Sequence, residues 1–484
     1  MATSLKRQMA SGIAWTAVQK YSGIVITIII SMILSRLLTP KDFGVVGIAT
    51  TLCGFFNMFT DFGMGGAVVQ MKDLTKSDIS SIFSLTIYIG IFLASLFFLA
   101  SYPIASFYGD PKLISVCQIM CIGLLFTSFN IIPNALLFKE KKFRFIAIRT
   151  VIIQIIIGVA SIIAALCGAG VYALLIDTIF SGFLIFLVSY HIYKIKFSFK
   201  INWDPIKKIA SYSLYQFGFM LVNYFSRNLD NILIGKYISL KELGYYQKSY
   251  SIMLMPVQNI TNVITPALHP ILSDYQNNKD FIKEEYNKIL KILSALGFPI
   301  SIILFFCADE IIIILFGGQW TPAITPFRIL SITIGFQIIG STVGAIYQAM
   351  NATNWLFLVG ILNTITNVVL LFITLTVFKT IESVAWGILI STLISLWNWP
   401  YMYHVLFRST CCSMLKSITP GLIISITLII ALASISFITK DTNIFLSLAL
   451  KLTISLIITS YLIQKLDIID LKKLAKRKSS DQKA

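Results

Sequence analysis

Long apolar runs dominate the sequence and decide what the chain can fold into. Fourteen runs have about 20 or more residues each, the length that an α-helix needs to cross a bilayer. Only 12% of the 484 residues are charged, about half the share in a soluble protein. The sequence therefore predicts an all-α polytopic membrane protein without a soluble domain, with spans at about 12–35, 43–69, 79–101, 113–138, 145–167, 170–193, 209–235, 243–269, 287–309, 322–349, 355–378, 382–406, 415–438 and 442–464.

Basic residues collect on one side of the predicted membrane. Of the 39 Lys and Arg residues, 26 lie in segments on the side of the N-terminus, and seven lie in segments on the opposite side. Because positive charge marks the cytoplasmic side, both termini and the connections 194–208 and 270–286 are predicted to be cytoplasmic. The net charge of +18 is then a basic rim that faces anionic lipid. It is not a nucleic-acid groove, and no nucleic-acid partner is expected.

A short polar interruption occurs twice at a spacing of 200 residues. RLLTPKDFG at 36–44 is repeated as KYISLKELG at 236–244. TPKD in the first copy and SLKE in the second have a Ser or Thr followed three residues later by an acid, which is the pattern of a helix capping box. The predicted cap pairs are Thr39 with Asp42 and Ser239 with Glu242.

Further repeats predict the domain organisation. FYGDP at 107–111 is answered by FGGQW at 316–320, and GVYALLI at 170–176 by SVAWGILI at 383–390. Since six is an even number, two six-helix bundles enter the membrane in the same direction, as a parallel repeat about a pseudo-twofold axis along the membrane normal. A ligand site is expected between the halves. The predicted parts are an N-terminal six-helix bundle at 1–200, a C-terminal six-helix bundle at 201–410, two accessory helices at 411–465 and a basic cytoplasmic tail at 466–484.

These motifs resemble a known family. SRLLTPKDFGVVGIA, FTDFGMGGAVVQ, LDNILIGKYISLKELGYY and the FYGDP and FGGQW turns are similar to those of the polysaccharide-transporter branch of the multidrug/oligosaccharidyl-lipid/polysaccharide (MOP) flippase superfamily. This branch includes flippases for lipid-linked O-antigen, colanic-acid and teichuronic-acid repeat units. The resemblance implies a V-shaped cleft between the bundles, in the bacterial inner membrane. It also implies that the chain moves undecaprenyl-pyrophosphate-linked oligosaccharide to the outer leaflet by alternating access, with polymerase or other glycan-assembly proteins as partners.

Charged residues inside the predicted spans are candidate site residues, because a charge in lipid is costly unless it is paired or used. Lys20 and Asp61 lie at equal depth, and Arg227 and Asp230 share one helix face. Arg149, near an inner helix end, is expected only to extend to the interface. The candidates are the cleft cations Lys20, Arg227 and Lys248 for a diphosphate, the acids Asp61, Asp230 and Asp177 for a coupling ion or charge pair, and Asn223 and Gln216 as polar lining.

The sequence has no motif for catalysis or for a resident cofactor. The seven cysteines lack metal-ligand spacing and there is no P-loop, so neither a metal site nor nucleotide hydrolysis is expected. The chain is predicted not to be an enzyme and to need no cofactor, with transport coupled to Na⁺ or H⁺. Three alternatives stay open. They are a multidrug or cation exporter of the same superfamily, a flippase for the peptidoglycan precursor lipid II, and a polytopic glycan polymerase or ligase.

Overall fold

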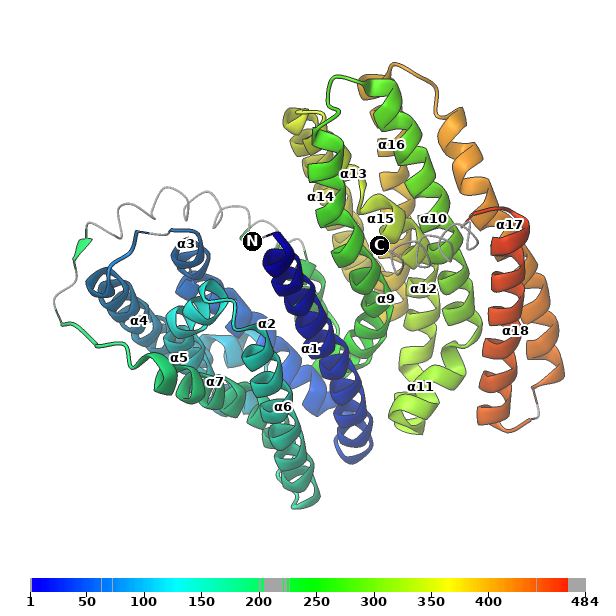
Figure 1. Cartoon of the computed structure of the whole chain (residues 1–484). Helices are drawn as coiled ribbons and strands as arrows, with labels where there is room; N and C mark the ends of the chain where they lie inside the picture. Colours follow the sequence, from blue (N-terminus) through cyan, green and yellow to red (C-terminus); the bar gives the residue numbers. More distant parts are fainter. Residues whose placement is uncertain are drawn as a thin grey trace. The chain divides into compact units, whose positions relative to one another are not determined.

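The computed structural model describes an all-helical chain. The residues it describes are 2–61, 63–71, 73–199, 202–203, 221, 224–225, 227–440 and 442–468, and none of these residues is in a β-strand. The chain forms two compact units, a first unit of Met1–Gly244 and a second unit of Tyr245–Ala484 (Figure 1). The predicted all-α class is confirmed. The predicted bundle boundary at residue 200 and the pseudo-twofold repeat stay predictions.

Long helices joined by short turns build each unit. The first unit contains α1 (Ala2–Leu37), α2 (Pro40–Asp61), α3 (Met64–Gln70), α4 (Lys76–Tyr108), α5 (Lys112–Lys139), α6 (Phe143–Leu166) and α7 (Val171–Tyr193). The other helices, of which α9 starts in the first unit, are α9 (Leu240–Ser273), α10 (Lys279–Phe306), α11 (Ala308–Phe316), η1 (Gly318–Ala323), α12 (Ile324–Gly340), α13 (Val343–Ala349), α14 (Thr353–Ile373), η2 (Thr374–Phe378), α15 (Ile381–Ile394), η3 (Ser395–Trp397), α16 (Asn398–Phe407), α17 (Cys412–Ile438) and α18 (Ile444–Lys465).

Twelve helical stretches in the described part of the chain are long and apolar enough to cross a membrane. They coincide with twelve of the predicted spans. The predicted span 209–235 lies largely outside the described residues, and the span 243–269 lies within α9, a helix of 34 residues. The chain is therefore a multi-pass membrane protein, and the count of fourteen spans stays a prediction.

Two predicted segments differ from the structure. The run 43–69 was expected to be one helix, but α2 ends at Asp61 and α3 begins at Met64, after Gly63 with φ of 74°. The run 270–286 was expected to be a loop, yet α10 already begins at Lys279, behind the N-cap Asn278. Apolar runs mark only the part of a helix that lies in lipid, so polar helix ends beyond it escape detection.

The repeated polar turns form the predicted helix starts. In the first copy Asp42 Oδ2 accepts hydrogen bonds from the Thr39 backbone N–H at 3.1 Å and from Thr39 Oγ1 at 2.6 Å, while the Asp42 N–H donates to Thr39 Oγ1 at 3.3 Å. In the second copy the Glu242 N–H donates to Ser239 Oγ at 3.1 Å. These side chains satisfy N–H groups that the first turn of a helix leaves without partners. The predicted caps of α2 and α9 are confirmed.

The two capped turns also pack against each other inside the first unit. A Cβ on Gly44 would lie 1.6 Å from the Leu240 carbonyl oxygen, and a Cβ on Gly244 would lie 2.0 Å from the Pro40 carbonyl oxygen. Since positions 40 and 44 correspond to 240 and 244 in the repeat, the contact is reciprocal. Glycine at both positions lets the two backbones approach closely, as small residues do between membrane helices. This contact accounts for the presence of glycine in both copies.

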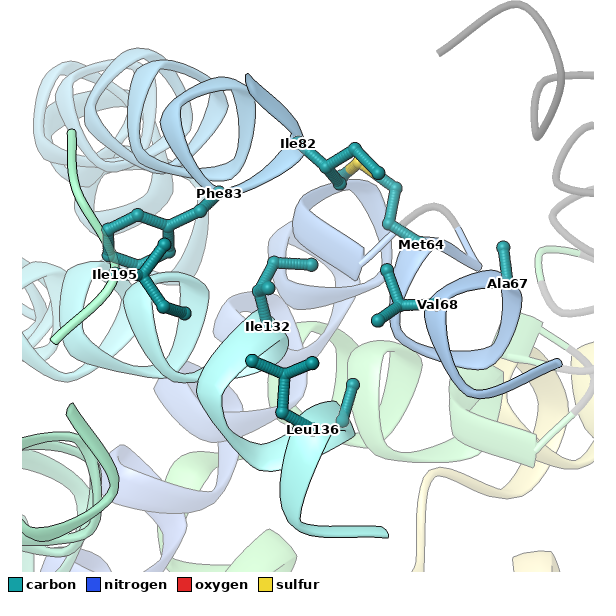
Figure 2. Close-up of a cluster of buried hydrophobic side chains, with 9 residues drawn as sticks. Met64, Ala67, Val68, Ile82, Phe83, Ile132, Leu136 and Ile195 are labelled. Atoms are coloured by element: carbon teal, nitrogen blue, oxygen red, sulfur yellow. The ribbon is translucent and has the colours of Figure 1, made fainter. Parts of the chain in front are cut away.

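A cluster of buried apolar side chains holds α3 in the first unit. Met64, Ala67 and Val68 of α3 meet side chains of α4 and α5, including Ile82 and Ile132 (Figure 2). Ile195, in the segment after α7, completes the cluster. The same segment runs beside α4, where the Ser198 N–H donates to Ser84 Oγ at 2.8 Å. The short α3 is therefore fixed on the bundle despite the helix break before it.

The two accessory helices belong to the second unit. α17 packs on α10, where a Cβ on Gly421 would lie 2.5 Å from the Ser294 carbonyl, and α18 packs on α17. Ala295, Ile424 and Leu428 form the buried core of this contact. The close approach again depends on a glycine, so the accessory helices are integral to the packing of this unit.

Candidate functional site

Lys20 is a half-buried lysine inside the membrane-spanning part of α1. It makes no ion pair or hydrogen bond with the described residues. Its predicted partner Asp61 is occupied elsewhere, because Asp61 Oδ1 accepts a hydrogen bond from the Gly65 N–H at 3.0 Å. α2 ends at Asp61, so this carboxylate serves the free N–H groups of the next helix. The predicted Lys20–Asp61 pair is therefore wrong for this structure.

Arg227 and Asp230 are close in sequence but differ in their surroundings. Arg227 is exposed and makes no ion pair with the described residues, whereas Asp230 is buried and accepts a hydrogen bond from the Asn231 N–H at 2.8 Å. The acid does not hold the arginine, contrary to the charge pair that their spacing predicted. Asn223 and Gln216, predicted as polar lining, lie outside the described residues.

Asp177 of α7 is exposed and has no hydrogen bond or ion pair with the part of the chain that the structure describes. Together with Lys20 and Arg227 it makes three charges in the first unit that no described side chain neutralises. A charge at membrane depth is stable only where water, a ligand or an ion reaches it. These three residues are the predicted site residues that remain accessible for a ligand or a coupling ion.

Lys248 of α9 is buried in the second unit against aromatic rings. Its Nζ lies 4.7 Å from the ring centre of Phe316 and 5.6 Å from that of Trp320. Trp320 is fully buried, and its ring also meets Tyr245 edge-on, with ring centres 5.8 Å apart. Cation–π contacts of this kind stabilise a desolvated lysine. In this conformation Lys248 contacts the aromatic core and is not exposed as a cleft cation.

A buried ion pair in the second unit escaped prediction. Lys451 Nζ of α18 lies 2.5 Å from Glu310 Oε1 of α11, and both side chains are less than a tenth exposed. Lys451 also donates to the Phe306 carbonyl at 3.0 Å, and Ser447 Oγ donates to the same carboxylate oxygen at 2.7 Å. The apolar run predicts a span that ends at residue 309, one residue before Glu310, so Glu310 is not among the predicted site residues. The acidic pair in ADE at 308–310, facing a lysine within a later span, was the available signal.

Arg149 is also placed differently from its prediction. It is buried between α5, α6 and α7, where it donates to Ser189 Oγ at 2.5 Å and to Asn134 Oδ1 at 3.1 Å. It does not extend to the interface. An arginine six residues into a helix is long enough either to extend to the interface or to bind neighbouring helices, so its position in the sequence does not distinguish the two. Its contacts tie three helices together at one end of the first unit.

An all-helical described chain with twelve candidate spans and isolated charges inside them has the architecture of a multi-pass membrane protein. The chain belongs to the family described as polysaccharide biosynthesis protein, whose model matches residues 33–325. This match includes both capped turns and Arg227. This match confirms the predicted resemblance to proteins of polysaccharide biosynthesis.

Individual relatives and a solved structure agree with this family. The chain is 24% identical over 353 residues to an uncharacterized membrane protein in the cps region of Klebsiella pneumoniae, covering 72% of each chain. It is 24% identical over 356 residues to the teichuronic acid biosynthesis protein TuaB of Bacillus subtilis, covering 73% of this chain and 74% of that one. Its fold is similar to that of the lipid II flippase MurJ in an inward closed conformation, with a TM-score of 0.69 and 16% identity. The match covers 94% of this chain and 99% of the MurJ chain. Of these three similar proteins, MurJ is a flippase by its name.

Proposed function

We propose that the chain translocates polyprenyl-pyrophosphate-linked oligosaccharide repeat units from the cytoplasmic to the outer leaflet of the bacterial inner membrane. The observation that carries this proposal is the family match over residues 33–325. The fold shared with MurJ supports it, because that protein is a flippase for lipid II by its name. The basic rim of the sequence supports a cytoplasmic location for both termini.

Within this function, Lys20 and Arg227 serve as cations for the diphosphate and the sugars. Both lack an ion-pair partner among the described residues, so neither has to break a protein contact in order to bind an anion. Charge-assisted hydrogen bonds to phosphate are about twice as strong as neutral ones. Asp177 is the accessible acid, and we assign it to a coupling Na⁺ or H⁺. The lipid tail remains in the bilayer throughout.

The proposal is tested by the lipid-linked saccharides that accumulate in a deletion strain. Mass spectrometry of lipid extracts should find repeat units on polyprenyl pyrophosphate at raised levels, and the wild-type chain should return them to normal. Lys20→Ala and Arg227→Ala should fail to do so at equal membrane expression, while Lys20→Arg should retain part of the activity. Lys440→Ala, which removes an exposed cation beyond α17, is the matched control.

Two outcomes would contradict the proposal. Unchanged lipid-linked saccharides in the deletion strain, together with increased sensitivity to cationic drugs, would favour a multidrug exporter. Accumulation of lipid II in place of other repeat units would favour a peptidoglycan-precursor flippase. If the alanine variants complement as well as wild type while the saccharides do accumulate, the function stands and the assigned cations are wrong.

A further inference from the structure

A cavity of about 840 Å³ lies at the end of the first unit where α1 meets the connection between α5 and α6. Trp15 of α1 forms part of its wall. Glu140, Lys141, Lys142 and Arg144 line it from the connection and the first turn of α6. None of these residues belongs to the candidate site inside the membrane. The cavity combines an aromatic side chain with several charges at the level of a membrane surface, as predicted from the ends of the apolar runs.

Positive charge prevails in this cavity. Lys142 Nζ lies 2.7 Å from Glu140 Oε2, and their hydrogen bond holds the pKa of Glu140 below its ordinary value, so this acid neutralises that lysine. Lys141 and Arg144 are exposed and make no ion pair with the described residues. The Arg144 guanidinium lies 5.5 Å from the ring centre of Trp15, which restricts where it can go. Two cations are left for an anionic ligand.

The start of α6 adds to the attraction for an anion. α6 is 24 residues long, and its first turn has no side-chain cap, since Lys142 at the N-cap position makes no such hydrogen bond. The free N–H groups of a helix N-terminus carry partial positive charge and bind phosphate groups readily. The helix start, Lys141 and Arg144 thus contribute in the same direction within one cavity.

An exposed apolar stripe begins at the cavity and continues along α6. Ile148 lines the cavity, and Ile152, Ile156, Val159 and Ile163 follow at helical spacing, each exposed by at least 40%. α1 packs beside α6 along this length, as Figure 1 shows, with a hydrogen bond from Gln154 Nε2 to Thr27 Oγ1 at 2.8 Å. A ligand with an anionic head and a hydrocarbon chain fits the cationic cavity and the apolar stripe together. A free anion would contact only the cavity.

We propose that this cavity binds the phosphate head group of a membrane lipid, with Lys141 and Arg144 on the phosphate and the lipid chain along the exposed stripe of α6. The shared chemistry is a lipid phosphate, which either an anionic phospholipid or a polyprenyl diphosphate can supply. The inference does not rest on the proposed function, because a lipid site on the rim exists whether or not this lipid is the cargo. The test of lipid binding at this cavity and the test of glycan transport can therefore fail independently of each other.

A variant without strain is available for the test. Lys141 has φ of 57° at the end of α5, where its N–H bonds the Phe138 carbonyl and the Lys142 N–H bonds the Leu137 carbonyl, each at 3.0 Å. Glycine is the usual residue at this place in such a helix end, so Lys141→Gly removes the cation and suits the backbone. Lys194 ends α7 in the same left-handed conformation, and Lys194→Gly is the matched control.

The experiment compares two double variants of the purified full chain by native mass spectrometry. The cavity variant is Lys141→Gly/Arg144→Gln, and the control is Lys194→Gly/Lys76→Gln, which removes two exposed cations elsewhere. Each is titrated with phosphatidylglycerol, phosphatidylcholine, polyprenyl diphosphate and inorganic phosphate. The cavity variant should bind phosphatidylglycerol about tenfold more weakly than wild type, since each basic residue near anionic lipid strengthens binding severalfold. The control should stay within about twofold, and thermal unfolding checks that both fold.

The titrations with different ligands distinguish the possible occupants of the cavity. Competition between polyprenyl diphosphate and phosphatidylglycerol supports the shared lipid-phosphate site, and binding of only one of them identifies the source. Equal weakening in both double variants would overturn the proposal, because the effect would then belong to the rim charge as a whole. Inorganic phosphate binding as tightly as the lipids would overturn the role of the apolar stripe. Undiminished lipid binding by the cavity variant would exclude this cavity.

Discussion

Single charged residues inside the membrane differ in how the fold treats them. Glu310 and Lys451 are buried together and share one short contact, whereas Lys20 and Arg227 have no ion-pair partner among the described residues. Placing a lone lysine or arginine at the centre of a spanning helix costs about 2.5–3.5 kcal/mol on insertion scales. The buried pair avoids most of this cost, and the unpartnered cations do not. The fold thus separates charges that stabilise packing from charges that are accessible to a ligand.

The Glu310–Lys451 pair predicts a characteristic pattern of stability. Glu310→Gln or Lys451→Met alone leaves one buried charge without its partner and should lower the free energy of unfolding by about 3–5 kcal/mol. The double variant Glu310→Gln/Lys451→Met removes both charges and should recover much of the loss. Thermal unfolding in detergent measures all three. Additive losses in the double variant, or no loss in either single one, would contradict a coupled pair.

Lys41 and Asp110 form an ion pair with Nζ and Oδ2 2.7 Å apart, and Asp110 lies between two candidate membrane spans. Burial raises the pKa of Asp110, but hydrogen bonds from Lys41 and from the Lys112 N–H outweigh it and hold the pKa below its ordinary value. The stability from this depressed pKa is present above about pH 4 and is lost as the pH falls through the lower, folded-state pKa.

Asp110→Asn should therefore lower the free energy of unfolding by about 0.5–1 kcal/mol at pH 7, because one partner of the pair is exposed. The difference from wild type should shrink below about pH 4, where Asp110 becomes protonated in the wild type as well. Asp73→Asn, an exposed acid without a partner among the described residues, is the control. A difference that stays constant down to pH 3, or no difference at pH 7, would rule out this account.

Helices and turns could be predicted well from the sequence, because length and end residues are local properties. Apolar runs located the twelve described spans, and the cap residues located the starts of α2 and α9. The pairing of charges could not be predicted in the same way. Equal depth in two helices does not fix their rotation, so Lys20 and Asp61, which the sequence places at equal depth, form no ion pair. Where a polar residue lies beyond an apolar run, as Glu310 does, the sequence pattern does not mark it as buried.

The reciprocal glycine contact between the starts of α2 and α9 is open to a direct test. Gly44→Ala places a methyl group on the Leu240 backbone, which cannot move aside as a side chain can, and should cost about 2 kcal/mol of unfolding free energy. Gly66→Ala in α3 is the control, because its Cβ meets nothing within 4 Å. The thermal unfolding temperature and the rate of glycan export should both fall for Gly44→Ala and stay at wild-type values for Gly66→Ala. Wild-type values for both would mean that the two helix starts do not depend on this close approach.

For the whole molecule, orientation in the membrane follows from the charge bias and remains a prediction. After Cys167, Cys411 and Cys412, which are not buried, are replaced by serine, Gly318→Cys should react with an impermeant thiol reagent in intact cells. Asn277→Cys should react only after the cells are opened. Gly318 suits the test, since a Cβ there has open space. Labelling of Asn277→Cys in sealed cells would reverse the proposed orientation.

The chain belongs to the polysaccharide biosynthesis family, and the proposed translocation of a lipid-linked glycan is the central claim about the whole molecule. It is tested most directly by where that glycan lies. Right-side-out vesicles from strains with and without the chain are treated with periodate, which does not cross the membrane, and the lipid-linked saccharides are then analysed by mass spectrometry. With the chain present, the glycan should be oxidised from outside. Without it, the glycan should be protected until detergent is added. Equal oxidation in both strains would contradict the claim.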